Sequence, residues 1–76
     1  MNNPNSIYVT FSTNVFNLRT EQSLTQTQLA KKMDTSPGFV CDYEKGRRNP
    51  TLATVERFAL ALSCSVSELL IPAVKI

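Results

Sequence analysis

Basic side chains gather in one part of this sequence, where they could bind phosphate groups. Five of the eight Lys and Arg residues fall between positions 31 and 48. Such a cluster is expected of a phosphate-binding surface, and it is also compatible with an ordinary solvated face. The formal net charge of +2 does not decide between the two interpretations. The cluster consists of Lys31, Lys32, Lys45, Arg47 and Arg48.

Residues that would support catalysis or hold a metal are sparse. The chain has no histidine, and its two cysteines, Cys41 and Cys64, lack the CxxC spacing of a zinc or redox site. No nucleophile–base pair is evident either. We therefore expect no enzyme, no metal and no cofactor, with both thiols free in a reducing compartment.

Length and composition predict one small globular domain. A chain of 76 residues buries only about 60% of its unfolded surface, which leaves little room for a catalytic cleft. An apolar fraction of 42% and a charged fraction of 18% are typical of a folded domain. No run approaches the ~18 apolar residues of a membrane span, and "MNNPNS" lacks the features of a signal peptide. We expect a cytoplasmic protein without a membrane partner.

Helical periodicity predicts an all-α domain over residues 10–71, with an extension at 1–9 and a tail at 72–76. Five short helices are expected. The first begins at about residue 10 or 12 and ends at 22, and the second covers residues 26–33. The third lies between its cap Ser36 and Gly46, the fourth runs from its cap Thr51 to about residue 62, and the fifth lies between Ser65 and Pro72.

Local signals mark several of these helix ends. Thr25 and Gln28 have the spacing of a capping box, and Leu24 and Leu29 flank it at the hydrophobic-staple positions. Pro37 falls at the first helical position, where its missing N–H costs nothing. Gly46 falls at the usual position of a glycine after a helix end, and Ser65 with Glu68 has the spacing of a second capping box. The fourth predicted helix has an apolar stripe formed by Leu52, Val55, Phe58, Ala59 and Leu62.

The second and third predicted helices have the size and connection of a helix-turn-helix. The segments "LTQTQLAKKM", "SPGFVCDYEKGRRNP" and "ALALSCSVSELL" resemble the Cro and phage-repressor type helix-turn-helix family, also called the Xre family. The resemblance covers residues 11–70. It implies a compact five-helix lambda-repressor-like domain that acts as a sequence-specific regulator of transcription, either a repressor or a Cro-like or controller-type switch.

The resemblance also implies partners. They are a double-stranded DNA operator with two half-sites, a second copy of the chain in a homodimer and, as a further candidate, RNA polymerase. An antitoxin-like protein-interaction module on the same fold is the alternative. Asp42 and the low net charge favour this alternative, whereas Gln26 and the Arg47–Arg48 pair argue against it.

The chain departs from the family pattern at three turns. Ser23, Asp34 and Ser63 stand where the family commonly has glycine. Aspartate enters the left-handed region at modest cost, and serine does so less readily. We therefore expect turns that are slightly strained or closed in a different way, on an unchanged fold.

The third helix should present distinct faces. With Val40 inward, Tyr43 and Glu44 fall on the core side, and Gly38, Asp42 and Lys45 fall opposite, with Phe39 and Cys41 at the edges. By resemblance, the front of this helix approaches base edges in the major groove. The candidate base contacts are Ser36, Pro37, Gly38, Phe39 and Asp42.

Three of these candidates have an alternative explanation. Gly38 either lets the backbone approach DNA closely or is simply tolerated near a helix end. Asp42 either accepts a hydrogen bond from cytosine N4 or is a surface charge that pairs with Lys45 or Arg48. Phe39 either contacts a thymine methyl or a sugar, or it fills the core against the second helix.

The resemblance assigns the remaining contacts. The phosphate contacts are Gln26, Lys45, Arg47, Arg48 and Asn49. Arg19 and Glu44 are expected to form a partly buried ion pair, with two ordinary surface charges as the alternative. The dimer contact is assigned to Leu60, Ile71, Val74 and Ile76, and the apolar segment at residues 7–9 is the second choice.

Overall fold

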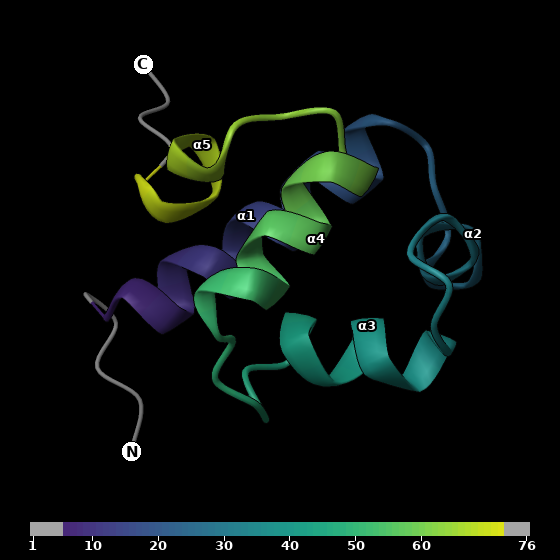
Figure 1. The fold of residues 1–76 in the computed structure, drawn as a ribbon, viewed down its shortest axis with the longest axis horizontal. Helices are drawn as coiled ribbons and strands as arrows, with labels where there is room; N and C mark the ends of the chain where they lie inside the picture. Colours follow the sequence, from purple (N-terminus) through teal and green to yellow (C-terminus); the bar gives the residue numbers. More distant parts are fainter. Residues whose placement is uncertain (1–5, 73–76) are drawn as a thin grey trace.

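The structure is a computed structural model that describes residues 6–72. None of these residues forms a strand, and five helices follow one another along the chain, which confirms the all-α prediction. In Figure 1, α3 lies along the lower edge, α2 lies at one end of the molecule, and α5 lies at the other end beside the start of α1. The helices are α1 (Ile7–Glu21), α2 (Gln26–Lys32), α3 (Pro37–Glu44), α4 (Leu52–Ala61) and α5 (Val66–Leu70).

A hydroxyl side chain starts every helix. Each cap accepts a hydrogen bond from a backbone N–H of the first turn, which satisfies one of the donors that a helix start leaves free. At α2 the capping box is complete, because the Gln28 Oε1 also accepts from the Thr25 N–H at 2.8 Å. At α5 the Glu68 N–H donates to Ser65, but the structure shows no reciprocal bond between these two residues. The caps are Ser6, Thr25, Ser36, Thr51 and Ser65.

Two sequence predictions about these helices are wrong. The first helix begins at Ile7, not at residue 10 or 12, because Ser6 supplies a cap and Ile7–Val9 form its first turn. Leu52 was placed on the apolar stripe, yet its side chain is 77% exposed. It occupies the first position of α4, where the helix extends past the edge of the core.

Aromatic rings occupy the centre of the core. The rings of Phe11 and Phe58 meet edge to face with their centroids 5.5 Å apart, and Tyr43 meets Phe58 at the same distance. These rings join α1, α3 and α4, and such pairs stabilise beyond the area that they bury. The aliphatic part of the core completes the fully buried set with Val15, Leu29, Val40, Leu62 and Leu69.

Four helices end in the same backbone motif. This motif follows α1, α2, α3 and α4. In each case the residue two positions after the C-cap donates its backbone N–H to the carbonyl of the residue five positions earlier, as Leu24 does to Arg19. The residue before it lies in the left-handed region, with φ of 58° at Ser23, 55° at Asp34, 71° at Gly46 and 55° at Ser63. The three non-glycine turns are therefore closed in the same way as the glycine turn, at a cost of roughly 1–2 kcal/mol each.

Arg19 and Glu44 form the buried ion pair that the resemblance implies. The Arg19 Nε and Nη2 donate to the two Glu44 carboxylate oxygens at 2.5 and 2.9 Å, and only 11% and 4% of the two side chains are exposed. The Arg19 Nη1 also donates to the Leu24 carbonyl at 2.8 Å. The hydrogen bond to Glu44 raises the pKa of Arg19 above its ordinary value. The pair therefore keeps its cation throughout the physiological range and would lose it only in strong alkali.

Breaking this pair should destabilise the fold strongly. Arg19→Met leaves the Glu44 carboxylate buried without its cation, so we expect a loss of ~3–5 kcal/mol from a total of ~5–15 kcal/mol. Urea unfolding measures the change. The control is Asp42→Asn, which removes an exposed pair and should cost less than about 1 kcal/mol. The double variant Arg19→Met/Glu44→Leu should recover most of the loss. Equal costs for Arg19→Met and Asp42→Asn would contradict a structural role for the pair.

Candidate nucleic-acid interface

Helix α3 turns one face into the core and leaves its front open. Val40 is fully buried and Tyr43 is 5% exposed, whereas Ser36, Pro37 and Gly38 are all exposed. Pro37 occupies the first turn as predicted, and the Ser36 Oγ accepts from the Phe39 N–H at 3.3 Å. The front of α3 is therefore held rigidly by its cap while it presents very little side chain to its surroundings.

Gly38 is not required by the packing of the protein. A Cβ added at this position would meet only the Ser36 Oγ, at 3.9 Å, which is an ordinary van der Waals distance. The structure gives Gly38 no positive φ either, unlike Gly46. The packing and the backbone conformation of the protein therefore give no reason for a glycine at this position.

Phe39 lies between α3 and α4. Its ring stacks on Phe58 at 6.0 Å and meets Tyr43 edge to face at 4.9 Å. It thus packs against Phe58 of α4 and against the core, and it remains partly exposed. The ring therefore belongs to the core and, through its exposed part, also to the surface at the start of α3.

Two arginine side chains lie over the Phe39 ring. The Arg48 guanidinium is 5.9 Å from the Phe39 ring centre and 5.6 Å from that of Tyr43. The Arg57 guanidinium lies 5.4 Å from Phe39 and also donates to the Met33 carbonyl at the end of α2, at 2.8 Å. Cation–π contacts of this length orient an arginine while leaving its N–H donors accessible. Arg57 could not be predicted from the sequence, because its partners lie far away along the chain and no local signal indicates them.

Asp42 has a partner on the surface, but not a predicted one. The Arg47 Nη1 lies 3.5 Å from the Asp42 Oδ1, with 60% and 37% of the two side chains exposed. Lys45 and Arg48 were the predicted partners. The turn after α3 explains the difference, because the Arg47 N–H donates to the Asp42 carbonyl at 2.9 Å and brings the two residues together. The contact is long and exposed, so it is weak and easily opened.

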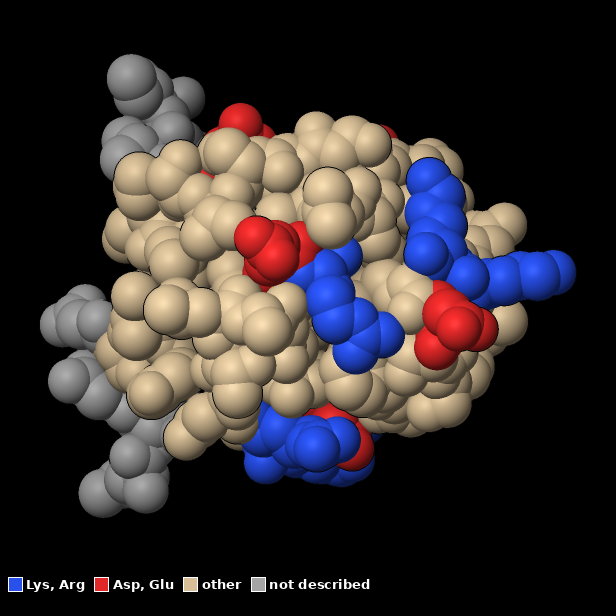
Figure 2. All heavy atoms as spheres, in the orientation of Figure 1, with Lys and Arg blue, Asp and Glu red and all other residues tan. Residues whose placement is uncertain are grey.

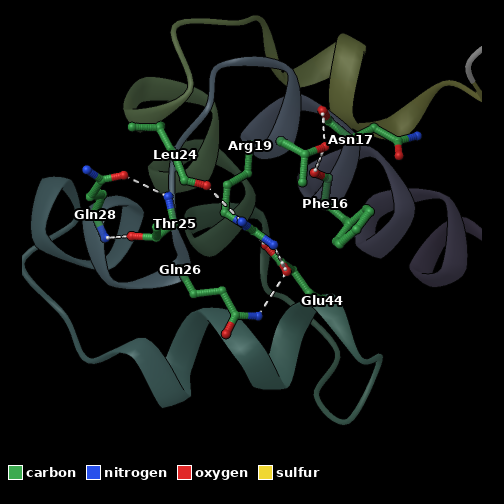
Figure 3. Close-up of polar contacts among 9 residues, drawn as sticks. Phe16, Asn17, Arg19, Leu24, Thr25, Gln26, Gln28 and Glu44 are labelled. Atoms are coloured by element: carbon green, nitrogen blue, oxygen red, sulfur yellow. Dashed lines mark hydrogen bonds and ion pairs between the residues drawn. The ribbon is translucent and has the colours of Figure 1, made fainter.

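Gln26 is attached to the buried ion pair. Its Nε2 donates to the Glu44 Oε1 at 3.0 Å, and Figure 3 shows Gln26 and Arg19 both reaching the same carboxylate. An amide nitrogen has two N–H donors, so one remains for another acceptor. The pair thereby joins the start of α2 to α1 and α3, and it fixes the orientation of the Gln26 amide.

On the face of the molecule shown in Figure 2, the basic residues lie in separate groups. Lys45 and Asn49 are exposed around the end of α3, and Lys31 and Lys32 are exposed on the last turn of α2. On the face shown in Figure 2, blue groups lie separately over α2, over α4 and at the connection after α3, with red acidic groups beside them. Positive potential is therefore local to each group.

Two of the four residues assigned to the dimer contact, Leu60 and Ile71, lie in the described part of the chain. Leu60 is 76% exposed and borders a shallow hollow of about 270 Å³, together with Lys32, Met33, Arg57 and Ala61. Ile71 is 60% exposed and follows α5, where its carbonyl accepts from the Asn14 Nδ2 at 2.9 Å. Val74 and Ile76 lie outside the described residues.

Metal ligands, long apolar helices and cysteines can be located directly between residues 6 and 72. That part of the chain holds no group of three residues that could ligate a metal, and none of its helices is long and apolar enough to cross a membrane. Cys41 and Cys64 are both free and partly buried. Burial, with a smaller effect of Glu68, raises the pKa of Cys64, so its reactive thiolate form is disfavoured.

Comparisons with known proteins agree with this geometry. The HTH_3 family model, described as helix-turn-helix, matches residues 15–69. The chain is 46% identical over 50 residues to an immunity repressor protein of Bacillus phage phi105, covering 66% of this chain and 35% of that protein. It is 34% identical over 59 residues to the cryptic phage CTXphi transcriptional repressor RstR of Vibrio cholerae, covering 78% of this chain and 53% of that one. The chain thus spans about a third to a half of the length of these repressors.

Another relative is matched over most of its length. It is an uncharacterized HTH-type transcriptional regulator, y4dJ, of Sinorhizobium fredii, 39% identical over 59 residues that cover 78% of this chain and 77% of that protein.

Two solved structures share the fold. The restriction-modification controller protein C.AhdI of Aeromonas hydrophila has a TM-score of 0.76 at 32% identity, covering 82% of this chain and 90% of that one. The hypothetical transcription factor NHTF from Neisseria has a TM-score of 0.85 at 24% identity, covering 95% and 83% of the two chains, and shows likeness of fold alone. The family match and the exposed start of α3 lead to one conclusion: this chain belongs to the Xre-type helix-turn-helix family of transcriptional regulators.

Proposed function

We propose that the chain is a sequence-specific double-stranded DNA-binding regulator that acts in the cytoplasm as a homodimer on an operator with two half-sites. The observation that carries the proposal is the exposed front of α3, where residues 36–38 are exposed while Val40 and Tyr43 of the same helix are buried in the core. A repressor or a Cro-like or controller-type switch is the proposed mode of action, with RNA polymerase as a further partner.

Base recognition is assigned to the front of α3. A helix of this kind enters the major groove with its first residues toward the base edges. Ser36, Pro37 and Gly38 bring few hydrogen-bonding groups, so the backbone comes close and direct readout there is modest. Asp42 and the exposed part of Phe39 are the remaining base-reading groups, for a cytosine N4 donor and for a thymine methyl or sugar.

Phosphate contacts are assigned to both sides of α3. On one side, Gln26 has a free N–H donor and an orientation set by Glu44. On the other side, Arg48 is held over two aromatic rings, whereas Arg47 is only weakly restrained by its exposed contact with Asp42. Groups that are already oriented lose less conformational entropy when a phosphate binds. Lys45 and Asn49 complete the proposed set.

The antitoxin-like alternative loses part of its support. It relied on Asp42 as a carboxylate that phosphates would repel. The structure places Arg47 beside that carboxylate, so its charge is partly offset within the protein. We therefore retain DNA as the proposed partner.

Selection of bound sequences from random duplexes, followed by footprinting, tests the proposal. The expected result is a motif with two related halves whose centres lie about one helical turn, ~34 Å, or a multiple of it apart. Recovery of no enriched motif would overturn the proposal and would favour a protein partner.

Gly38→Ala should separate DNA binding from folding. The added methyl group finds open space in the protein, so stability should rise by about 0.5–1 kcal/mol. Affinity for the selected operator should fall about tenfold, or ~1.4 kcal/mol, because the methyl group holds the backbone away from DNA. Thermal unfolding and a titration with labelled duplex measure the two effects. Unchanged affinity would show that Gly38 is merely tolerated. As a control, Gly46→Ala should lower stability, since φ is 71° at that position.

Arg47→Ala and Arg48→Ala should weaken binding to all sites about equally. Each variant loses one phosphate contact, so the slope of log affinity against log salt should become shallower by about 1. Titrations at several salt concentrations measure the slope. Lys31→Ala is the matched control, because this exposed lysine is assigned no contact and should leave the slope unchanged. A wild-type slope in both arginine variants would remove them from the interface.

Asp42→Asn should change which sequences are bound. If the carboxylate accepts from a cytosine N4, its loss should alter the preferred base at one position in each half-site, at a discrimination of roughly 1–3 kcal/mol. Repeating the selection with the variant gives the answer. An unchanged motif with higher overall affinity would identify Asp42 as a surface charge that only restrains Arg47.

A further inference from the structure

An apolar hollow lies on the side of the molecule away from α2. Its volume is about 220 Å³, and every residue that lines it is uncharged. In Figure 1, the elements around it are the start of α1, the start of α4 and the end of α5, all on the same side of the fold. The lining consists of Ile7, Tyr8, Phe11, Pro50, Leu52, Val55 and Leu70.

Exposed apolar side chains concentrate around this hollow. Of the six large hydrophobic residues that are exposed in the described chain, Ile7, Tyr8 and Leu52 line it, with 52%, 46% and 77% of each residue exposed. Ile71, at 60%, directly follows Leu70 at its edge. Contiguous apolar exposure of this kind marks an interaction surface.

Charge is absent over a long stretch beside the hollow. The first eighteen residues of the sequence contain no Asp, Glu, Lys or Arg, so the first charged side chain along α1 is Arg19. On α4 the nearest charge is Glu56, one turn beyond Leu52, and it does not line the hollow. Depletion of charged residues is typical of the centre of a protein–protein interface.

We propose that this hollow, with the exposed Ile7, Tyr8 and Leu52 around it, is the surface that pairs two copies of the chain. The inference deepens the proposed homodimer and rests on it. Two-fold pairing brings each surface against its own copy, so an uncharged surface meets itself without repulsion. Protruding side chains beside a concavity also suit this symmetry, because Leu52 of each copy can enter the hollow of the other.

The competing surface around Leu60 is less suited to self-pairing. Lys32 and Arg57 line the hollow beside it, so two copies facing each other there would bring four cations together. Like charges across an interface are costly and select against that pairing.

The proposed surface also fits the operator geometry. Leu52 follows closely on Arg47, Arg48 and Asn49 in the chain, with Pro50 between them at the edge of the hollow. In the proposed pair, the starts of the two α3 helices point away from the two-fold axis, because the hollow lies on the side of the molecule where α3 ends.

Two matched substitutions test the inference. Leu52→Glu and Leu60→Glu introduce the same carboxylate on the same helix, at positions with 77% and 76% exposure, each four residues from Glu56. Sedimentation of the full 76-residue chain without DNA gives the oligomeric state. We expect Leu52→Glu to raise the dimer dissociation constant at least tenfold and Leu60→Glu to leave it at the wild-type value. Thermal unfolding by circular dichroism checks that both variants fold, and Ile7→Glu on α1 decides the question if Leu52→Glu does not.

Several outcomes would overturn the inference. These are a wild-type chain that stays monomeric, a dimer that resists both Leu52→Glu and Ile7→Glu, and a dimer that only Leu60→Glu dissociates. Loss of the dimer on truncation after Pro72, with Leu52→Glu still dimeric, would assign the contact to residues 73–76. The proposed function fails in a different way. A dimer that depends on Leu52 but binds no selected duplex would retain this surface and remove DNA as the partner.

Discussion

The buried carboxylate of Glu44 is the point on which the candidate interface depends. It receives Arg19 from α1 through two hydrogen bonds and Gln26 from α2 through a third, and it belongs to α3 itself. Arg19 also fixes the turn between α1 and α2 through the Leu24 carbonyl. A charge this well enclosed is stable only with all its partners in place, so the relative positions of the three helices are set together. The orientation of Gln26 follows from the same contact, which links the stability of the fold to the preparation of the site.

The turns show that this family fold does not depend on glycine at every helix end. Ser23, Asp34 and Ser63 adopt the left-handed conformation and make the same pair of backbone hydrogen bonds as Gly46. Each non-glycine residue there costs roughly 1–2 kcal/mol. The core and the buried ion pair must offset this cost, so a small domain such as this one has little stability in reserve.

Most of the fold was predictable from the sequence because its signals are local. The caps Thr25, Ser36 and Thr51 and the stop at Gly46 depend on residues within one turn, and the structure confirms them. The start of α1 was predicted too late, because Ile7 to Val9 are apolar and include β-branched residues, which favour extended structure. In the structure the Ser6 cap starts the helix before them. The surroundings of the candidate site were less predictable. The contacts of Arg57 with Met33 and Phe39, and that of Gln26 with Glu44, join residues brought together only by the tertiary fold.

The charge of the chain explains why the proposed pairing would matter. With a net charge of only +2, one copy would make few of the proposed phosphate contacts, and the front of α3 offers few hydrogen-bonding side chains. Specific regulators bind with dissociation constants of ~10⁻⁸–10⁻¹¹ M, which a single small module does not reach through so few contacts. Joining two copies makes the second half-site encounter intramolecular and multiplies the affinity without any new base contact. In the proposed homodimer, modest base recognition on each half-site would be combined with an uncharged pairing surface, and specificity would come from the spacing of the two half-sites as much as from the bases within each.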